Sequence, residues 1–381
     1  METATARRTE YTTFEPVLHM AFELGEAKWK IGFTTGLGQK PRERTIDGRD
    51  LVALEHEIRL AKQRFGLAPE TPVKSCYEAG REGFWLHRYL VQKGVANVVV
   101  DAASLEVKRR RRRLKTDRVD LEKLCEMLVR YHLGDARVWS VVRVPSVAAE
   151  DARQLQRELG ALRAERTQHS NRIKGLLTTQ GVHLAVHSDF LTRLAAVRLW
   201  DGSRVAPGLR DRLGREYARW QVVQEQIRTL EKARHELQEH STEPAVAMVR
   251  QLLRLRGIGE ESAWLFVMEF FAWRGFRNRR EVGALAGLTP MPHQSGEEAR
   301  EMGISKSGNR HIRAMAIEIA CIWLRYQPDS ELSRWYQRRF GKGSKRLHKI
   351  GIVAVARKLL IDIWRYLEFD RIPPGAVLKP S

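Results

Sequence analysis

Four acidic residues near the N-terminus have the types and spacing to bind divalent metal ions. Asp117 and Asp120 lie three apart in KTDRVD, at the start of a helical pattern, so both side chains face the same way. Glu23 and Glu78 each end a β-forming run, and such strand ends face the crevice of an α/β sheet. Carboxylate oxygens suit Mg²⁺. The four could hold two ions about 3.5–4 Å apart, an arrangement that activates a nucleophile and stabilises the leaving oxygen in phosphodiester displacement.

Each of these acids also has a plain structural explanation. Aspartate is favoured at helix N-termini, so capping alone accounts for the spacing of Asp117 and Asp120. Glu23 and Glu78 could be solvated strand ends in a chain with 46 acidic residues. The order of the four along one α/β pattern is what favours the metal site.

A run of basic residues directly precedes the aspartate pair. It comprises Arg109, Arg110, Arg111, Arg112 and Arg113 in KRRRRR. An acidic cluster that handles phosphates repels its substrate, and arginines beside it would offset that repulsion. A solvated basic loop is the alternative, but the position of the run inside a domain favours contact with nucleic acid.

Two glycines in LRGIGEESA could bring backbone amides close to a phosphate. Gly257 and Gly259 lack the Cβ that would stand in the way, and the motif resembles half of a helix-hairpin-helix. A tight turn between two helices explains the same residues. The motif by itself is therefore a weak indication of nucleic-acid binding.

Ser295 in HQSGEEAR could act as a nucleophile. It lies beside a glycine in a proline-rich loop, where a strained turn would present its hydroxyl. Most serines in such loops only form turns. Ser305 and Ser307, in the later motif ISKSGNRHIR, are explained at least as well by capping of the helix that follows.

The same motif contains three cations that could bind nucleic acid. Arg310 and Arg313 lie three apart near the N-terminus of that helix, and Lys306 precedes it. The N-terminus of a helix and the guanidinium group of arginine both favour binding of a phosphate. Solvation of an exposed helix face is the alternative, and the sequence leaves both open.

The elements that must position these residues fall into three expected domains. Residues 15–147 mix strands and helices in α/β order, with a hairpin around Gly25 and helices near Leu51–Phe65 and Gly83–Gln92. Residues 148–245 hold two charged helical segments with apolar residues three and four apart, typical of an antiparallel coiled-coil arm. Such an arm usually dimerises, although an ordinary hairpin within one chain fits equally well. Residues 246–381 form a helical domain, so the fold class is α/β plus all-α.

Composition favours a polyanionic partner. The 381 residues include 67 Lys and Arg against 46 Asp and Glu, a net charge of +21. No run approaches the roughly 18 apolar residues of a spanning helix, and no secretory signal opens the chain, so we expect a protein of the cytoplasm or nucleoid. Cys76, Cys125 and Cys321 are too far apart for a structural zinc site, and we expect all three to be buried.

The motifs together resemble the DEDD-type transposases of bridge-RNA-guided insertion sequences. In the N-terminal part the resemblance rests on FELGEAKWKIGF, YEAGREG and LKTDRVDLEKL. In the C-terminal part it rests on LRGIGEESA, FRNRREVGALAGLTPMPHQSG and ISKSGNRHIR. It covers nearly the whole chain, and the last group is specific. The resemblance implies an RNase H/RuvC-like N-terminal domain and a C-terminal serine transposase domain.

The family's metal-binding tetrad falls on Glu23, Glu78, Asp117 and Asp120, and its serine nucleophile on Ser295. The cofactor implied is Mg²⁺, as two ions. One position departs from the family pattern, which usually begins with Asp where this chain has Glu23. The longer side chain changes the metal geometry, and Glu26 is the alternative ligand.

The resemblance implies an RNA-guided DNA recombinase of bacteria. A bridge RNA would pair with donor and target DNA, while the protein grips backbone and shape. Ser295 would form a covalent phosphoserine link, and a dimer or tetramer would bring the acids of one protomer to the serine of another. A metal-dependent Holliday-junction resolvase or nuclease without serine chemistry is the alternative. A non-catalytic nucleic-acid-binding protein, whose site has decayed at Glu23, is the third.

Overall fold

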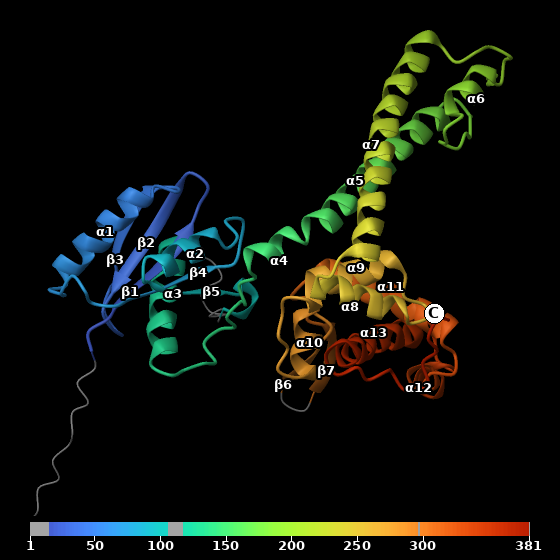
Figure 1. Cartoon of the computed structure of the whole chain (residues 1–381). Helices are drawn as coiled ribbons and strands as arrows, with labels where there is room; N and C mark the ends of the chain where they lie inside the picture. Colours follow the sequence, from blue (N-terminus) through green and yellow to red (C-terminus); the bar gives the residue numbers. More distant parts are fainter. Residues whose placement is uncertain (1–14, 106–116, 296–297, 381) are drawn as a thin grey trace, which may run out of the picture. The chain divides into compact units, whose positions relative to one another are not determined.

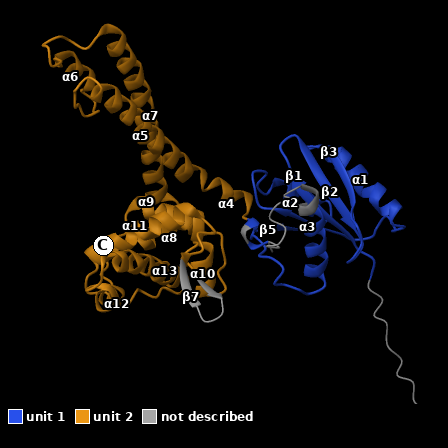
Figure 2. Ribbon diagram, turned by 180° about the vertical axis from the view of Figure 1, so that it is seen from behind, with its two compact units in different colours: residues 1–144 blue, residues 145–381 orange. Residues whose placement is uncertain are grey.

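The computed structural model describes residues 15–105, 117–295 and 298–380. The chain divides into two compact units, residues 1–144 and 145–381 (Figure 2). The expected boundary at 147 lies close to this division, whereas the expected segments 148–245 and 246–381 both belong to unit 2. The combination of a mixed α/β part with many helices, predicted from the sequence, is confirmed.

Unit 1 is built on a five-stranded sheet in the order β3-β2-β1-β4-β5 (Figure 1). Its strands are β1 (Leu18–Leu24), β2 (Lys28–Thr34), β3 (Arg42–Asp47), β4 (Val73–Glu78) and β5 (Ala96–Val100). The first three form an antiparallel meander, while β4 pairs parallel with β1 and β5 parallel with β4. The hairpin expected around Gly25 is present, since the Gly25 amide donates to the Lys28 carbonyl at 3.1 Å. The carboxyl ends of β1, β4 and β5 therefore meet at one edge.

Helices cover both faces of this sheet. They are α1 (Leu51–Arg64), α2 (Trp85–Gln92) and α3 (Asp117–His132), with a short 3₁₀ turn at Ala102–Ser104. Because strand side chains alternate between faces, Met20 and Phe22 share a core with residues of α1 and α2, whereas Ala21 and Cys76 pack with residues of α3. Gly32 lets α3 lie close to the sheet, since a Cβ there would come within 2.8 Å of Cys125 Sγ.

Unit 2 begins with a helical hairpin, here called the arm. It comprises α4 (Val147–Asp151), α5 (Gln154–Thr178), α6 (Phe190–Ala196) and α7 (Pro207–His240). Leu159, Leu162, Val223 and Ile227 form a core where α5 and α7 lie side by side (Figure 1). The turn region expected between the two long helices contains the short helix α6, whose Phe190 is fully buried.

The rest of unit 2 is a helical body. Its elements are α8 (Pro244–Leu253), α9 (Glu260–Phe266), the π-helix η3 (Val267–Phe271), α10 (Arg279–Leu285), β6 (Pro290–Ser295), β7 (Glu298–Ile304), α11 (Arg310–Tyr326), α12 (Glu331–Phe340) and α13 (Lys345–Phe369). Trp264, Phe270 and Trp323 are buried in its core. The last helix was expected from Ile350 but begins at Lys345, where the Ser344 side chain accepts from the Leu347 amide.

The structure corrects two local expectations. The segment holding Ser295 was expected to be a loop, but Pro290–Ser295 pairs with Glu298–Ile304 as an antiparallel hairpin. The prolines that suggested a loop are tolerated because each strand of a two-stranded hairpin has a free edge. Cys321 was expected to be buried but is exposed, because it follows the buried Ala320 by one residue and so points off the packed face of α11. Cys76 and Cys125 are buried as expected.

None of the helices within the described ranges is long and apolar enough to cross a membrane.

Charged hydrogen bonds fasten the arm to the body. The buried guanidinium of Arg234 on α7 lies 3.1 Å from Glu260 Oε2 and 3.2 Å from Glu261 Oε2. Arg157 on α5 holds Glu269 of η3 with two contacts, at 2.5 and 3.0 Å. Both arm helices are thus joined to α9 and η3 by pairs that are partly shielded from water.

Within the arm, Glu216 on α7 joins one histidine and two arginines. Its oxygens lie 2.7 Å from His169 Nδ1 and 2.9 Å from both Arg172 Nη1 and Arg219 Nη1. Burial alone would raise the pKa of Glu216, but these hydrogen bonds outweigh it and lower the pKa to about 2. The carboxylate therefore stabilises the arm in its charged form.

Glu216→Gln should destabilise the arm. The amide cannot replace the charge-assisted hydrogen bonds, and we expect a loss of about 2–3 kcal/mol near neutral pH. Amide hydrogen exchange of α5 and α7 peptides measures it. Because the folded pKa lies below the unfolded value of 4.5, the stabilisation is present above pH 4.5 and is lost as the pH falls towards 2, so wild type and variant should converge there.

The control is Glu225→Gln, which removes an exposed pair with Arg228 on the same helix. That change should shift stability by less than about 0.5 kcal/mol. Equal exchange rates in the two variants would contradict the role given to Glu216.

Candidate functional site

The direction of α3 places its first turn at the carboxyl edge of the sheet. Its last residue, His132, lies beside His19 near the start of β1, with ring centroids 5.7 Å apart. Midway along, Cys76 Sγ of β4 approaches the Leu124 carbonyl at 4.0 Å. The helix therefore runs opposite to the parallel strands. The backbone of Asp117 and Asp120 begins it at the end where β1 and β4 finish.

Glu23 and Glu78 lie on neighbouring strands at that same edge. The parallel register pairs Phe22 with Tyr77, and the two glutamates are the next residues on their strands. Each lies two positions beyond a residue that packs against α3, so both are on the α3 face of the sheet. The fold thus brings together the backbone of all four predicted ligands. The side chains of Asp117 and Asp120 lie outside the described residues.

Asp101 is an acid at this edge that the sequence reasoning missed. It directly follows β5, the third parallel strand, where its amide donates to the Ser140 carbonyl at 2.9 Å. Its own carbonyl accepts from Ser104 Oγ at 2.7 Å. The available signal was an acid closing the run VANVVVD, the same pattern that singled out the glutamates. It is a further candidate ligand.

Glu26, the alternative to Glu23, is engaged elsewhere. It accepts from Arg81 Nη1 at 2.8 Å, a contact that joins the turn after β1 to the turn after β4. Both side chains are exposed, so the pair adds little stability.

Carboxylate oxygens are hard ligands, so a site built from these acids would bind Mg²⁺ in preference to a softer metal ion. The side chains that the structure describes contain no cluster of three His, Cys, Asp or Glu able to hold a metal ion. Two of the four predicted ligands fall outside that set, so the metal site remains a prediction. Arg109, Arg110, Arg111, Arg112 and Arg113 also lie outside the described residues.

Ser295 is the last residue of β6, paired in register with Glu298 of β7. Its side chain lies outside the described residues. The base of this hairpin is closed between the segment that follows α10 and the segment that precedes α11: the Ser305 amide donates to the Thr289 carbonyl at 2.9 Å, and the Lys306 amide to the Gly287 carbonyl at 3.1 Å. The hairpin is therefore anchored at its base.

The three predicted cations follow the hairpin at the start of α11. Arg313 Nη1 donates to the Lys306 carbonyl at 3.0 Å, so this side chain braces the turn. Lys306 and Arg310 are exposed. Asn309, rather than Ser305 or Ser307, caps the helix, since its side chain accepts from the His311 and Ile312 amides.

The Gly257–Gly259 loop is occupied by contacts within the chain. The Gly259 amide donates to Ser262 Oγ at 3.2 Å, and Lys379 Nζ donates to the Ile258 carbonyl at 2.8 Å. A phosphate at the Gly259 amide would have to compete with Ser262. Binding of nucleic acid by this loop remains a prediction.

The acids belong to unit 1, whereas Ser295, Lys306, Arg310 and the glycine loop belong to unit 2.

Comparison with known proteins identifies similar sequences. Residues 249–337 match a family described as "Transposase IS116/IS110/IS902 family". A putative transposase, y4rJ, of Sinorhizobium fredii is 39% identical over 380 residues, which cover 95% of this chain and 94% of that protein. The transposase for insertion sequence element IS1328 of Yersinia enterocolitica is 27% identical, with 66% of this chain and 71% of that protein covered. A probable family 20 transposase of Pseudomonas aeruginosa is 28% identical, with 66% and 72% covered.

Gly287→Ala should destabilise the base of the hairpin, where the segment after α10 meets the segment before α11. Gly287 has φ +68°, and a Cβ there would lie 2.0 Å from the Ser307 carbonyl oxygen. The left-handed backbone and the clash both cost free energy, so we expect a loss of about 2–5 kcal/mol in thermal or urea unfolding.

Gly303→Ala is the matched control. Gly303 has φ +82°, but a Cβ there meets no described atom within 4 Å. Only the backbone strain applies, so about 1–2 kcal/mol should be lost. If both variants lost the same stability, the close approach of residues 287 and 307 would not hold the hairpin.

Proposed function

Because the chain belongs to the IS116/IS110/IS902 family of transposases, we propose that it cuts, exchanges and rejoins DNA strands with a magnesium-binding acidic site and a serine nucleophile, guided by RNA. The direction of α3 is the observation that supports the acidic site, because it brings the start of that helix to the ends of β1 and β4. An RNase H/RuvC-like identity for unit 1 is part of the proposal. The strand order β3-β2-β1-β4-β5 supports it.

In the acidic site, Glu23, Glu78, Asp117 and Asp120 would hold two Mg²⁺ ions. The ions would supply Lewis-acid stabilisation of charge on the phosphate oxygens. The protein's part is to fix the ligands on a rigid sheet and helix, so that little reorganisation is needed during the reaction. Glu23 reaches one methylene further than the aspartate of the family pattern, which shifts its carboxylate away from the backbone of β1.

In the serine step, Ser295 Oγ attacks a DNA phosphorus. An Oγ–P bond forms, a P–O bond to a sugar breaks, and the serine proton ends on the released sugar hydroxyl. A hydroxyl of another strand then attacks the phosphoserine, which rejoins DNA and regenerates Ser295. The exposed cations Lys306 and Arg310, on the segment that follows the hairpin, support this assignment because they favour a phosphate there.

RNA guidance accounts for a strongly basic chain without an obvious base-reading module. A net charge of +21 suits binding to donor DNA, target DNA and a guide RNA through their backbones. The serine of one protomer meeting the acids of another would make the enzyme a dimer or tetramer. The arm is the candidate contact between protomers.

Ser295→Ala should abolish the covalent protein–DNA species. We expect the yield of adduct on denaturing gels, with labelled DNA and guide RNA, to fall by roughly a thousandfold or more, since alanine has no hydroxyl to form the bond to phosphorus. Ser305→Ala is the control, because Ser305 lies at the base of the same hairpin and its side chain accepts a hydrogen bond from Ser307 Oγ at 3.1 Å. Recombination by Ser295→Ala at the wild-type rate would refute the serine assignment.

Asp117→Asn should stop Mg²⁺-dependent cleavage of DNA, because the amide is a poor ligand for the ion. Glu126→Gln, an exposed change on the same helix, should leave cleavage intact. Cleavage that requires Asp117 but not Ser295 would indicate the junction resolvase instead. Wild-type protein that binds its nucleic acids without cleaving them would indicate the non-catalytic alternative.

A further inference from the structure

Residues 332–361, in α12, α13 and the turn between them, contain no acidic residue. The stretch between Glu331 and Asp362 carries nine cations: Arg334, Arg338, Arg339, Lys342, Lys345, Arg346, Lys349, Arg357 and Lys358. The chain as a whole has 46 acids among 381 residues, so a stretch of this length would be expected to contain several. A solvated helix face usually interleaves both signs. This stretch therefore needs another explanation.

Capping residues and a contact between side chains hold α12 and α13, which carry these cations, in place. The Ser330 side chain caps α12 by accepting from the Ser333 amide, and Ser344 caps α13 in the same way. Tyr336 Oη on α12 lies 3.0 Å from His348 Nδ1 on α13, which ties the helices together beside the turn. The cations at the turn are thus held in a constant arrangement.

We define the α12–α13 basic surface as five exposed residues around this turn: Arg338, Arg339, Lys342, Lys345 and Arg346. Across the described part of the chain, no carboxylate forms an ion pair with any of them. No carboxylate among the described residues is therefore paired with them to offset their mutual repulsion.

Helix stability explains only part of this arrangement. Arg338 and Arg339 lie in the last turn of α12, where the helix dipole favours cations. Lys345 and Arg346 lie in the first turn of α13, where the dipole disfavours them and where no acid is present. Their placement costs stability in the free protein. An anionic ligand would reverse that cost.

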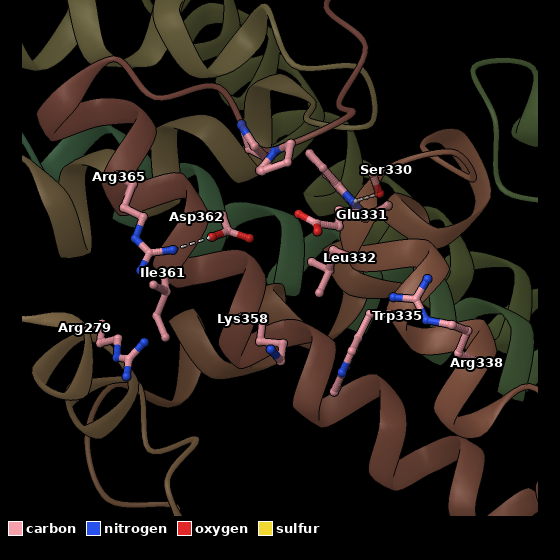
Figure 3. Close-up of a pocket in the computed structure, with 13 residues that line it drawn as sticks. Arg279, Ser330, Glu331, Leu332, Trp335, Arg338, Lys358, Ile361, Asp362 and Arg365 are labelled. Atoms are coloured by element: carbon pink, nitrogen blue, oxygen red, sulfur yellow. Dashed lines mark hydrogen bonds and ion pairs between the residues drawn. The ribbon is translucent and has the colours of Figure 1, made fainter.

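Two hollows adjoin the surface, and Arg338 lines both. One, of about 470 Å³, is lined by Gln337, Arg338, Arg339, Lys342, Gly343 and Leu347. The other, of about 370 Å³, has cations from three helices around it: Arg279 of α10, Arg338 of α12, and Lys358 and Arg365 of α13 (Figure 3).

The acids in this second hollow do not cancel its charge. Asp362 is paired with Arg365 at 3.2 Å, and burial raises the pKa of its carboxyl. Glu331 is the other acid, against four cations. Lys358 lies over the Trp335 ring at 4.5 Å from its centroid. The hollow therefore keeps an excess of positive charge.

We propose that the α12–α13 basic surface binds the phosphodiester backbone of duplex DNA. The inference rests on the proposed function, because an enzyme that exchanges strands must also hold the duplex that flanks the reacting phosphate. The surface adds to Lys306 and Arg310, which follow the serine hairpin, and makes no contact with base edges. It contributes affinity without sequence preference.

The test compares two triple variants of the full chain with the same loss of charge. The first, Arg338→Gln/Lys342→Gln/Arg346→Gln, removes cations of the surface. The control, Arg212→Gln/Arg215→Gln/Lys232→Gln, removes three exposed cations of α7. Fluorescence anisotropy with a labelled DNA duplex over a range of KCl gives the slope of log K against log salt concentration.

The surface variant should show a slope shallower by about 2–3, because each lost phosphate contact removes about 0.9. Its affinity at about 0.15 M salt should fall at least tenfold. The control should keep the wild-type slope. A charge-conserving variant, Arg338→Lys/Arg346→Lys, should also keep it, which shows that the effect is not a loss of folding.

Equal slopes in the surface variant, the control and wild type would overturn the inference while leaving the proposed strand exchange intact. A loss seen with single-stranded RNA but not with duplex DNA would overturn it in favour of an RNA surface. Wild-type protein without measurable affinity for duplex DNA would overturn both this inference and the proposed function.

Discussion

The contact between α3 and the central sheet is the constraint on which the candidate acidic site depends. Gly32 leaves room for the helix beside β2, because a Cβ there would come within 2.8 Å of Cys125 Sγ. Because the helix packs along β1 and β4 in the opposite direction, its N-terminus can lie only at their carboxyl ends. Apolar packing thus brings the backbone of the four acids to one edge of the sheet, and the proposed divalent cations would offset the repulsion between their carboxylates.

Much of unit 1 could be predicted from the sequence, and the reasons for the failures are physical. The strands ending at Glu23 and Glu78 are apolar runs with clear ends, and α1 and α2 were expected close to where they lie. The edge strand β3 was not identified, because RERTID is mostly exposed and lacks the alternation of a half-buried strand. The apolar spacing of α5 and α7 predicted the arm, but the pairing of Glu216 with His169 depends on which residues meet across the two helices.

The candidate sites differ in how far sequence reasoning could reach. The order of the acids along the chain can be read from the sequence, whereas the placement of Glu23 beside Glu78 depends on the parallel register of β1 and β4. Asp101 follows the same pattern of an acid after an apolar run, and the parallel pairing of β5 with β4 places it at the same edge. The segment of Ser295 was misread as a loop since its prolines concealed the pairing of β6 with β7. The basic surface on α12 and α13 was also open to detection, as a long stretch without an acid, but only the folded turn shows that its cations share one place.

The ion pairs at the base of the arm allow α7 to transmit a rotation over its whole length. This helix has 34 residues, a length of about 50 Å at 1.5 Å per residue. Arg234 and Arg157 pair with acids of α9 and η3, and these contacts resist bending where the arm joins the body. A tilt of about 5° at the base of α7 would therefore move the far end of the helix by about 4 Å. A displacement of the tip would reach, through the same contacts, the helix α9 that begins at Glu260.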